Sequence, residues 1–385
     1  MSDSALGRLR ILDLSRVLAG PLATMTLADL GAEVTKIERP GSGDDTRSWG
    51  PPHDSSGEAT YFQAVNRNKT SVALDLGDPG DLAEAHRLAL ASDVVVENFR
   101  PGVMAKLGLD YESLAAENPG LVYCSVSGFG GSGPGAELPG YDLLVQALGG
   151  LMSVTGEPDG EPLKVGVALV DVITGLHAAV GILAAVRHRE QTGEGQHVEV
   201  ELMTSLLAAL VNQSSAYVSA GVVPTPAGNR HPSIAPYETF PTADRQIALA
   251  CGNDKQFRAL CIALDLLSLP DEPRFSTNPS RVEHADDLRA ILSTAFARAG
   301  ADHWHEVLTK VGVPCGPIND IDAAFAFAES LGLAPVVEVP TADGGTLRQV
   351  SDPITLSATP PTYRSAPPRL GADTDAVVAW LRDPA

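Results

Sequence analysis

The chain has 385 residues, with 48 acidic side chains against 27 Lys and Arg, which gives a formal net charge of −21. Apolar residues make up 44% of the chain and charged residues 19%, a composition typical of packed globular proteins and far from that of disordered ones. Binding to DNA or to an anionic membrane surface needs an extended basic face, so the acidic balance argues against both nucleic acid and membranes as partners.

Short β-branched runs alternate with helical patterns over the first two hundred residues, which predicts an α/β fold with a mostly parallel, doubly wound sheet. The expected strands are Arg10–Leu14, Glu33–Ile37, Ser71–Leu76, Asp93–Glu97, Leu121–Ser127 and His197–Leu202. The expected helices are Pro21–Leu30, Asp81–Ala91, Asp171–Glu190 and one that continues through Ala220. Residues 1–221 are therefore expected to form the N-terminal part of a large domain.

The composition changes at residues 222–236, where closely spaced prolines and a glycine are typical of a linker between domains. A smaller α+β domain is expected over residues 237–318. It would contain two strands between Glu238 and Cys251 and helices at Asp254–Leu266, Ala285–Arg298 and Ala301–Val311. Later elements are a helix at Ile321–Ser330, β-like segments on both sides of Asp343-Gly344-Gly345, and a final helix at Asp375–Leu381.

The sequence also predicts a cytoplasmic protein. Asp13 and Arg16 interrupt the apolar stretch that a signal peptide would need. The longest apolar run, residues 165–186, contains Asp171 and His177, which argues against a membrane span. No cysteine pair has the spacing of a zinc site, so we expect buried thiols and no bound metal.

A glycine-rich segment, residues 128–133, fits the pattern GxGxxG directly after an expected strand. A dinucleotide site also needs a helix that opens at the third glycine, whereas Pro134-Gly135 follows here. The segment is better explained as a loop that passes close to a ligand, and a nicotinamide-dependent enzyme is only a minor alternative.

Asp171 is a lone carboxylate within an apolar segment at the start of an expected helix. It could be a helix N-cap, because aspartate at that position accepts hydrogen bonds from the first backbone N–H groups. Alternatively, a partly desolvated carboxylate could attack an electrophilic carbonyl group. Gly175, Ala178 and Ala179 follow on the same helix face, and their small side chains either leave room for a ligand or allow tight helix packing.

Basic residues stand at strand ends or in loops of the first half of the chain. In a parallel sheet these loops meet at one crevice, where a phosphate-bearing ligand would explain them, although each one could also be ordinary solvated surface. The residues are Arg39, Arg67, Lys69, Arg100 and Lys106.

Several segments, in order along nearly the whole chain, resemble the family III CoA-transferases, to which the α-methylacyl-CoA racemases are related. The resemblance is carried by residues 12–21, 29–34, 36–40, 98–102, the Asp171 segment, and residues 193–196, 252–254 and 312–317. It implies a Rossmann-like large domain that residues 319–385 return to and complete, and two interlocked subunits. The implied partners are an acyl-CoA donor and a carboxylic acid acceptor, with no permanently bound cofactor.

The family's nucleophilic aspartate corresponds to Asp171. In the family mechanism this carboxylate forms an anhydride with the donor acyl group, CoA converts the anhydride into an aspartyl-CoA thioester, and the acceptor acid then takes over CoA. The resemblance places Tyr141 and Asp142 near this carboxylate. The residues expected to bind CoA, with Lys69 and Arg100 from the basic loops among them, are Val17, Leu18, Arg39, Lys69, Asn98, Phe99, Arg100, Lys106, Tyr141 and Asp142.

Three departures from family patterns bear on specificity. Leu18 stands where formyl-CoA transferases have glutamine, and residues 251–254 replace a glycine run, which argues against formate and oxalate as substrates. The racemases use a histidine where Tyr141 stands, and a phenol with an ordinary pKa near 10 is a poor base at neutral pH. CoA transfer is therefore expected, with a racemase and a noncatalytic CoA-ester binding protein as the alternatives.

Overall fold

The computed structural model describes residues 4–54 and 56–382, which divide into two compact units. Unit 1 contains the described parts of residues 1–151, 164–223 and 334–385. Unit 2 contains residues 152–163 and 224–333. Both ends of the chain thus contribute to unit 1.

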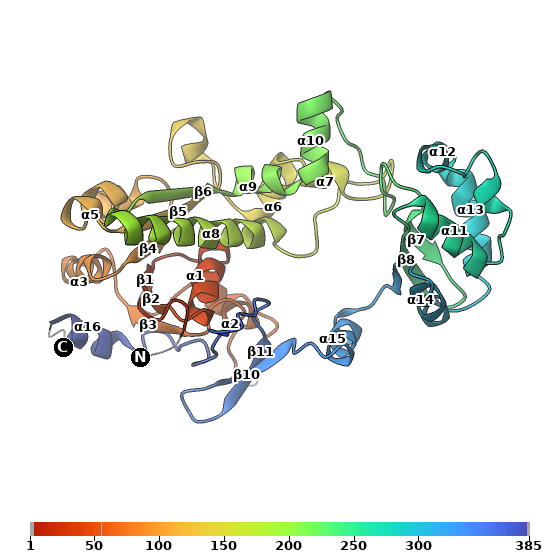
Figure 1. The fold of residues 1–385 in the computed structure, drawn as a ribbon. Helices are drawn as coiled ribbons and strands as arrows, with labels where there is room; N and C mark the ends of the chain where they lie inside the picture. The colour runs from red at the N-terminus through yellow and green to blue at the C-terminus, as the bar shows by residue number, and fades with distance from the viewer. Residues whose placement is uncertain (1–3, 55, 383–385) are drawn as a thin grey trace. The chain divides into compact units, whose positions relative to one another are not determined.

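A six-stranded parallel sheet forms the centre of unit 1, as the alternating pattern predicted (Figure 1). Its order is β3 (Lys69–Ala73), β2 (Glu33–Glu38), β1 (Arg10–Asp13), β4 (Val94–Glu97), β5 (Val122–Ser127) and β6 (His197–Glu201). In this order the direction of winding reverses between β1 and β4, and ligands of doubly wound sheets bind beyond the carboxyl ends of the strands at such a reversal. Strand β3 begins two residues before the predicted start at Ser71, because Lys69 already pairs with Val34 of β2.

Helices cover both faces of this sheet, and the central strands β4 and β5 are accordingly apolar along most of their length. Helices α1 (Ala19–Asp29) and α8 (Leu169–Thr192) pack on the face that presents Ile11, Val94 and Val96. The opposite face presents Leu12, Val95 and Tyr123 to a cluster that includes side chains of α3 (Pro79–Leu90), α4 (Val103–Leu107), α5 (Tyr111–Glu117) and α16 (Thr374–Arg382). Successive strand residues therefore alternate between two hydrophobic cores.

Helix α8 is, among the described residues, the one helix long and apolar enough to cross a membrane. Its buried side chains, which include Ala178, Ala179 and Ile182, belong to the core beneath the sheet, so α8 is a core helix of unit 1. A Cβ atom added at Gly175 would lie 2.6 Å from the carbonyl oxygen of Ala19. The small residues of α8 thus allow close packing against α1, which corrects the interpretation that they leave room for a ligand.

The C-terminal segment lies against the outer edge of β3. Asp373 accepts a hydrogen bond from the Ser71 backbone N–H (2.8 Å), and Thr374 accepts one from that of Ala73 (2.9 Å). An antiparallel hairpin, β10 (Val336–Pro340) and β11 (Thr346–Val350), turns at the predicted Asp343-Gly344-Gly345 segment. The remaining α-helices between residues 56 and 223 are α2 (Thr60–Gln63), α6 (Asp142–Leu148), α7 (Leu151–Val154), α9 (Leu202–Ala209) and α10 (Val211–Ala220).

Unit 2 has its own antiparallel sheet, β7 (Tyr237–Pro241), β8 (Gln246–Ala250) and β9 (Cys315–Pro317). The third strand was not predicted, because three residues that include a glycine and a proline give no strand pattern. The helices of unit 2 are α11 (Asp254–Ala263), α12 (Asn278–Glu283), α13 (Ala285–Phe296), α14 (Ala301–Lys310) and α15 (Ile321–Ser330).

The Gly252-Asn253-Asp254 segment has a structural explanation within unit 2. The Asn253 side chain accepts a hydrogen bond from the Gln256 backbone N–H (2.9 Å) and so caps α11, while Gln256 accepts one from the Gly252 N–H (2.9 Å). Asp254 pairs with the fully buried Arg281 at 2.7 Å. These contacts fix the turn that joins β8 to α11.

Candidate active site

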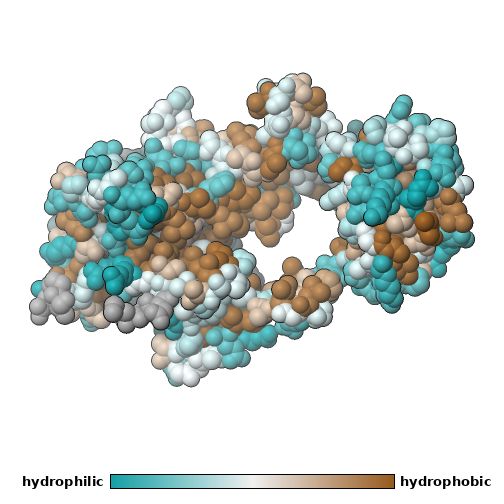
Figure 2. All heavy atoms as spheres, viewed as in Figure 1, coloured by the Kyte–Doolittle hydropathy of each residue, from teal (hydrophilic) through white to brown (hydrophobic). Residues whose placement is uncertain are grey.

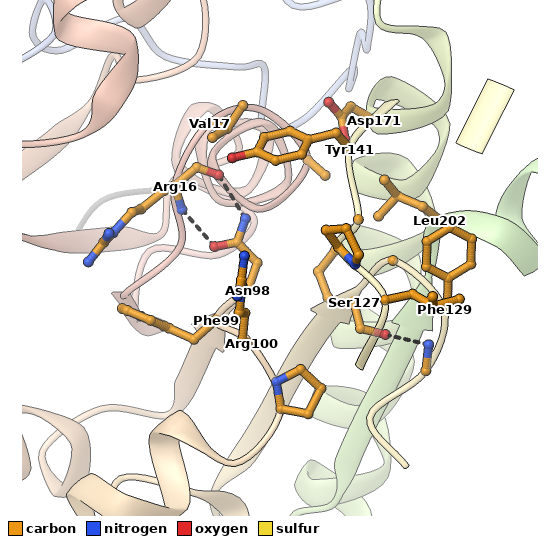
Figure 3. Close-up of a pocket in the computed structure, with 18 of the residues that line it drawn as sticks. Arg16, Val17, Asn98, Phe99, Arg100, Ser127, Phe129, Tyr141, Asp171 and Leu202 are labelled. Atoms are coloured by element: carbon orange, nitrogen blue, oxygen red, sulfur yellow. Dashed lines mark hydrogen bonds between the residues drawn. The ribbon is translucent and has the colours of Figure 1, made fainter. Parts of the chain in front are cut away.

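A cavity of about 280 Å³ lies where the winding of the sheet reverses, at the carboxyl ends of β1, β4 and β5 (Figure 3). Its walls come from residues 16–19, 98–101, 126–130, 135–136 and 138–141, together with Asp45, Asp171 and Leu202. Seven of the residues predicted from the sequence meet here, although they come from four separate parts of the chain. They are Val17, Leu18, Asn98, Phe99, Arg100, Tyr141 and Asp171.

The glycine-rich segment after β5 forms part of this wall. Gly128 and Gly130 line the cavity, and a short 3-10 turn at Gly133–Glu137 follows instead of an α-helix. The interpretation as a loop close to a ligand, rather than a dinucleotide fingerprint, fits this geometry.

Asp171 lies in the first turn of α8, which begins at Leu169, so it is not the N-cap. The capping carboxylate belongs to Asp142, which accepts hydrogen bonds from the backbone N–H groups of Val170 (2.8 Å) and Asp171 (3.3 Å). The other oxygen of Asp142 accepts a hydrogen bond from Gln146 at 2.6 Å. The Asp171 carboxylate has no hydrogen-bond or ion-pair partner among the described residues, so it is free to react in the cavity.

Burial raises the pKa of Asp171 to about 7, and the nearby charge of Asp142 contributes to the increase. A large fraction of Asp171 is therefore ionised at neutral pH, while the carboxylate is less solvated than one on the surface. A titratable group with such a perturbed pKa in a cleft is a candidate for catalysis.

We expect the Asp142→Asn variant to shift the acidic limb of the pH profile of kcat/KM to lower pH. In the wild-type enzyme this limb should have an apparent pKa of about 7, because the ionised form of Asp171 is the reactive one. Asparagine keeps an oxygen to cap α8 but removes the charge that raises the pKa of Asp171. Initial rates between pH 5 and pH 9 test this, and an unmoved limb in a folded variant would contradict it.

The sequence analysis missed Tyr61, which lies near Asp171, and Trp49, which packs against Tyr61. Burial raises the pKa of Tyr61, and the charges of Asp171 and Asp142 raise it further, which places this phenol in the electric field of both carboxylates. The Tyr61 ring packs edge-on against Trp49, with 5.3 Å between ring centroids. Their segment, residues 45–63, has no regular hydrophobic period from which either residue could be predicted.

Arg16 was also missed as a site residue, since its motif gave no reason to separate it from its neighbours. Its guanidinium lies over the Phe99 ring at 4.8 Å, and both residues line this cavity and a second one of about 240 Å³. The backbone N–H of Arg16 donates to Asn98 (2.9 Å), whose amide donates to the Arg16 carbonyl (2.7 Å). Arg16 thus stands at the boundary between two cavities with its guanidinium free of any carboxylate partner among the described residues.

The second cavity contains the predicted Arg39, together with the apolar side chains of Leu14, Ile37 and Leu74. Lys106 is exposed on α4, whose residues Val103 and Leu107 line this cavity, but Lys106 itself does not line it.

Lys69 and Arg67 do not reach either cavity. The three donors of the Lys69 ammonium are used by Asp13, Asn66 and the Pro21 carbonyl, each at 2.9 Å, and the side chain is fully buried. Arg67 is bound to the buried Asp29 at 2.6 Å. The prediction that Lys69 binds CoA is not supported, because an ammonium group has three donors and all are occupied.

Residues 6–374 match the family described as CoA-transferase family III. The chain belongs to this family. It is 44% identical, over 98% of its length and 95% of the other chain, to the succinate–glutarate CoA-transferase of Agrobacterium fabrum. The succinyl-CoA:glutarate CoA-transferase of Mus musculus is 40% identical over 95% of this chain and 84% of its own.

A solved structure, a CAIB/BAIF family protein from Brucella suis, superimposes on this chain with a TM-score of 0.88 and 41% identity, covering 98% of this chain and 99% of that one. As a family III CoA-transferase, the protein moves CoA from an acyl-CoA thioester to a free carboxylic acid. No group of three or more His, Cys, Asp or Glu side chains that could hold a metal ion occurs in residues 4–54 and 56–382.

Proposed function

We propose that the protein transfers CoA from succinyl-CoA to a dicarboxylic acid of the glutarate class, with Asp171 as the covalent nucleophile. The observation that carries this proposal is the free Asp171 carboxylate in the cavity, with its pKa near neutrality. It is supported by the names of similar proteins, in which succinate, glutarate, oxalate and mesaconate occur as the acids.

In the proposed reaction, a carboxylate oxygen of Asp171 attacks the thioester carbonyl carbon of the donor. A C–O bond forms, the C–S bond breaks, and CoA leaves as a thiolate. The thiolate then attacks the aspartyl carbonyl carbon of the anhydride, so that succinate leaves and Asp171 carries CoA as a thioester. The acceptor carboxylate repeats the two steps in reverse, which restores the Asp171 carboxylate and releases the new acyl-CoA without any net oxidation or reduction.

The charges around the two cavities suit anionic substrates in an otherwise acidic protein. Arg16 and Arg100 line the cavity that contains Asp171, and Arg39 lines the second cavity with Arg16. We infer that the nucleotide end of CoA occupies the second cavity and that its pantetheine arm passes Arg16 and Phe99 toward Asp171. Arginine binds phosphate and carboxylate groups through paired hydrogen bonds, which fits both ends of such a substrate.

Trapping of the enzyme-bound thioester tests the role of Asp171. After incubation with succinyl-CoA alone, borohydride should reduce the Asp171 thioester to an alcohol, and hydroxylamine should convert it to a hydroxamate. Peptide mass spectrometry locates either product. Modification at another residue, or none in an active enzyme, would contradict the proposal.

The acceptor class is tested with glutarate and its monomethyl ester as a matched pair. The ester keeps one free carboxylate and the chain length but loses the distal charge. We therefore expect its kcat/KM to be at least about tenfold lower, which corresponds to the loss of one charge-assisted hydrogen bond. Succinate, mesaconate, oxalate and butyrate complete the panel. Oxalate is included because it occurs in the name of a relative from Acetobacter aceti that is 44% identical over 82% of this chain. Equal rates with glutarate and its ester would show that the distal carboxylate is not recognised.

The Arg39→Gln variant should raise the KM for succinyl-CoA by about 10- to 100-fold with little change in kcat, because a charged contact to phosphate is worth about 1.5–3 kcal/mol. The matched control is Arg10→Gln, which changes an exposed arginine at the amino end of β1, outside both cavities. Steady-state kinetics with purified variants measure both effects. A KM equal to that of the wild type would remove Arg39 from the CoA site.

We also propose that the protein is a homodimer with interlocked subunits. Large apolar side chains are exposed on two helices, among them Leu176 and Val180 of α8 and Tyr217 and Val218 of α10. Figure 2 shows the brown, hydrophobic surface along α8. Exposed apolar patches of this kind are typical of protein interfaces. Size-exclusion chromatography with light scattering tests the proposal, and a monomeric mass at micromolar concentration would contradict it.

A further inference from the structure

Residues Ser15, Arg16 and Val17, which connect β1 to α1 beside the cavity, are held by side chains from other parts of the chain. Asp13 accepts a hydrogen bond from the Ser15 backbone N–H (2.9 Å), and Lys36 donates one to the Ser15 carbonyl (2.6 Å). Asn98 binds both the N–H and the carbonyl of Arg16. The Val17 N–H donates to both oxygens of Asp44, at 3.3 Å each.

Val17 has a φ of 69°, in the left-handed region of the backbone. This conformation is rare for a β-branched residue, since its side chain clashes with the backbone there. Such conformations persist only where surrounding contacts determine them, and they occur most often at functional sites. Val17 lines the cavity that contains Asp171, so its conformation shapes the place where the reaction occurs.

The pair of Lys36 and Asp44 is completely buried, with 3.1 Å between the ammonium nitrogen and a carboxylate oxygen. Neither residue lines either of the two cavities described above. Although burial opposes ionisation, the charge of Lys36 and hydrogen bonds from Thr46 keep the pKa of Asp44 below its ordinary value. The pair is therefore charged at neutral pH, although the transfer reaction does not use either group.

We propose that Asp44, with Lys36 as its counter-ion, is a positioning residue for CoA transfer: it holds Val17 in the left-handed conformation and thereby fixes the cavity wall beside Asp171. This inference rests on the proposed function of the cavity. Without the Asp44 contact, Val17 relaxes toward negative φ and the wall that aligns the thioester moves. A displacement of about 1 Å near a reacting group can lower its rate about a hundredfold.

The test removes the pair in two backgrounds, the wild-type chain and the Val17→Gly variant. Asp44→Ala and Lys36→Met are introduced together, so that no single charge remains buried. In the wild-type background we expect kcat to fall at least about tenfold, while circular dichroism shows a folded protein. In the Val17→Gly background the same pair should lower kcat less than about threefold, because glycine adopts positive φ without a steric penalty.

An equal loss of kcat in both backgrounds would overturn the inference, since a merely structural role would not depend on residue 17, and so would no loss in either. If the pair variant does not fold, Val17→Gly and Val17→Ala are compared by thermal unfolding. Both remove the isopropyl group, and the glycine variant should have the higher Tm; equal or lower Tm would overturn the inference. Asp171→Asn is assayed in parallel, because an active Asp171→Asn enzyme would refute the proposed site independently of residue 17.

Discussion

Replacement of Asp171 with asparagine should lower the rate of CoA transfer at least about a thousandfold, because the amide cannot form the acyl anhydride. The carboxylate lines the cavity without a hydrogen-bond partner among the described residues, so little else in the structure depends on it. Asp142→Asn is the matched control, since it removes the neighbouring carboxylate and keeps the nucleophile. Rates of succinyl-CoA:glutarate exchange at pH 8 should separate the two variants, and comparable activity of both would show that another residue is the nucleophile.

The Asp171→Asn variant should also be more stable than the wild-type protein above neutral pH. The pKa of Asp171 is about 7 in the folded protein, against an ordinary value of 3.8. Between these values the folded chain keeps a proton that the unfolded chain has lost, so wild-type stability falls as the pH rises from about 4 to about 7. Asparagine cannot ionise, so the variant avoids a loss of about 2–4 kcal/mol in the free energy of unfolding.

Thermal unfolding of the unliganded proteins measures this gain. The Tm of Asp171→Asn should exceed that of the wild type at pH 8, and the difference should become small near pH 4. A difference that does not change with pH would mean that the Asp171 carboxylate is not desolvated. Loss of activity together with a gain in stability is the pattern expected of a residue kept for function.

The second large effect is expected for Lys69→Met, which should lower stability by about 3–5 kcal/mol. Lys69 and Asp13 form a completely buried pair at 2.9 Å, and methionine would leave the Asp13 carboxylate buried without its cation. Burial by itself would raise the pKa of Asp13. The charges of Lys69 and Lys36 nevertheless hold this pKa well below its ordinary value, so Asp13 stays ionised. The Tm should fall by roughly 6–20 °C.

The double variant Asp13→Asn/Lys69→Met is the control for this prediction. Removal of both charges avoids the uncompensated carboxylate, so the double variant should be more stable than Lys69→Met alone. The KM for succinyl-CoA of folded Lys69→Met enzyme should stay within about twofold of the wild-type value, given that Lys69 lies outside both cavities. An unchanged Tm with a raised KM would return Lys69 to the CoA site.

Much of the fold could be predicted because local patterns are strong in parallel α/β proteins. The strand at Glu33 begins at the predicted residue, and the helix at Ile321–Ser330 has the predicted bounds. The hairpin turns at the predicted Asp343-Gly344-Gly345 segment. Short elements were harder to predict: β9 has three residues, and its pairing with β8 joins segments almost 70 residues apart.

The candidate site was predicted in part. The motif segments identified Asp171 and most of the cavity wall, since these residues stand at strand ends that a parallel sheet brings together. It was harder to predict which basic residues line a cavity and which are buried in ion pairs. Arg39 follows a strand and Lys69 begins one, yet Arg39 lines a cavity while the ammonium of Lys69 is buried against Asp13.

By itself, the sequence determined the α/β class, the parallel strands and the family, because hydrophobic period, turn residues and short motifs are local properties of the chain. Only the tertiary structure decided that Asp142, 29 residues away, caps α8 and leaves Asp171 free, and that Gly175 packs against α1. It also decided which cations line a cavity and which are buried in ion pairs. Solvation and pairing depend on every neighbour in space, so a residue's position in the sequence does not reveal whether its charge is neutralised, desolvated or open to substrate.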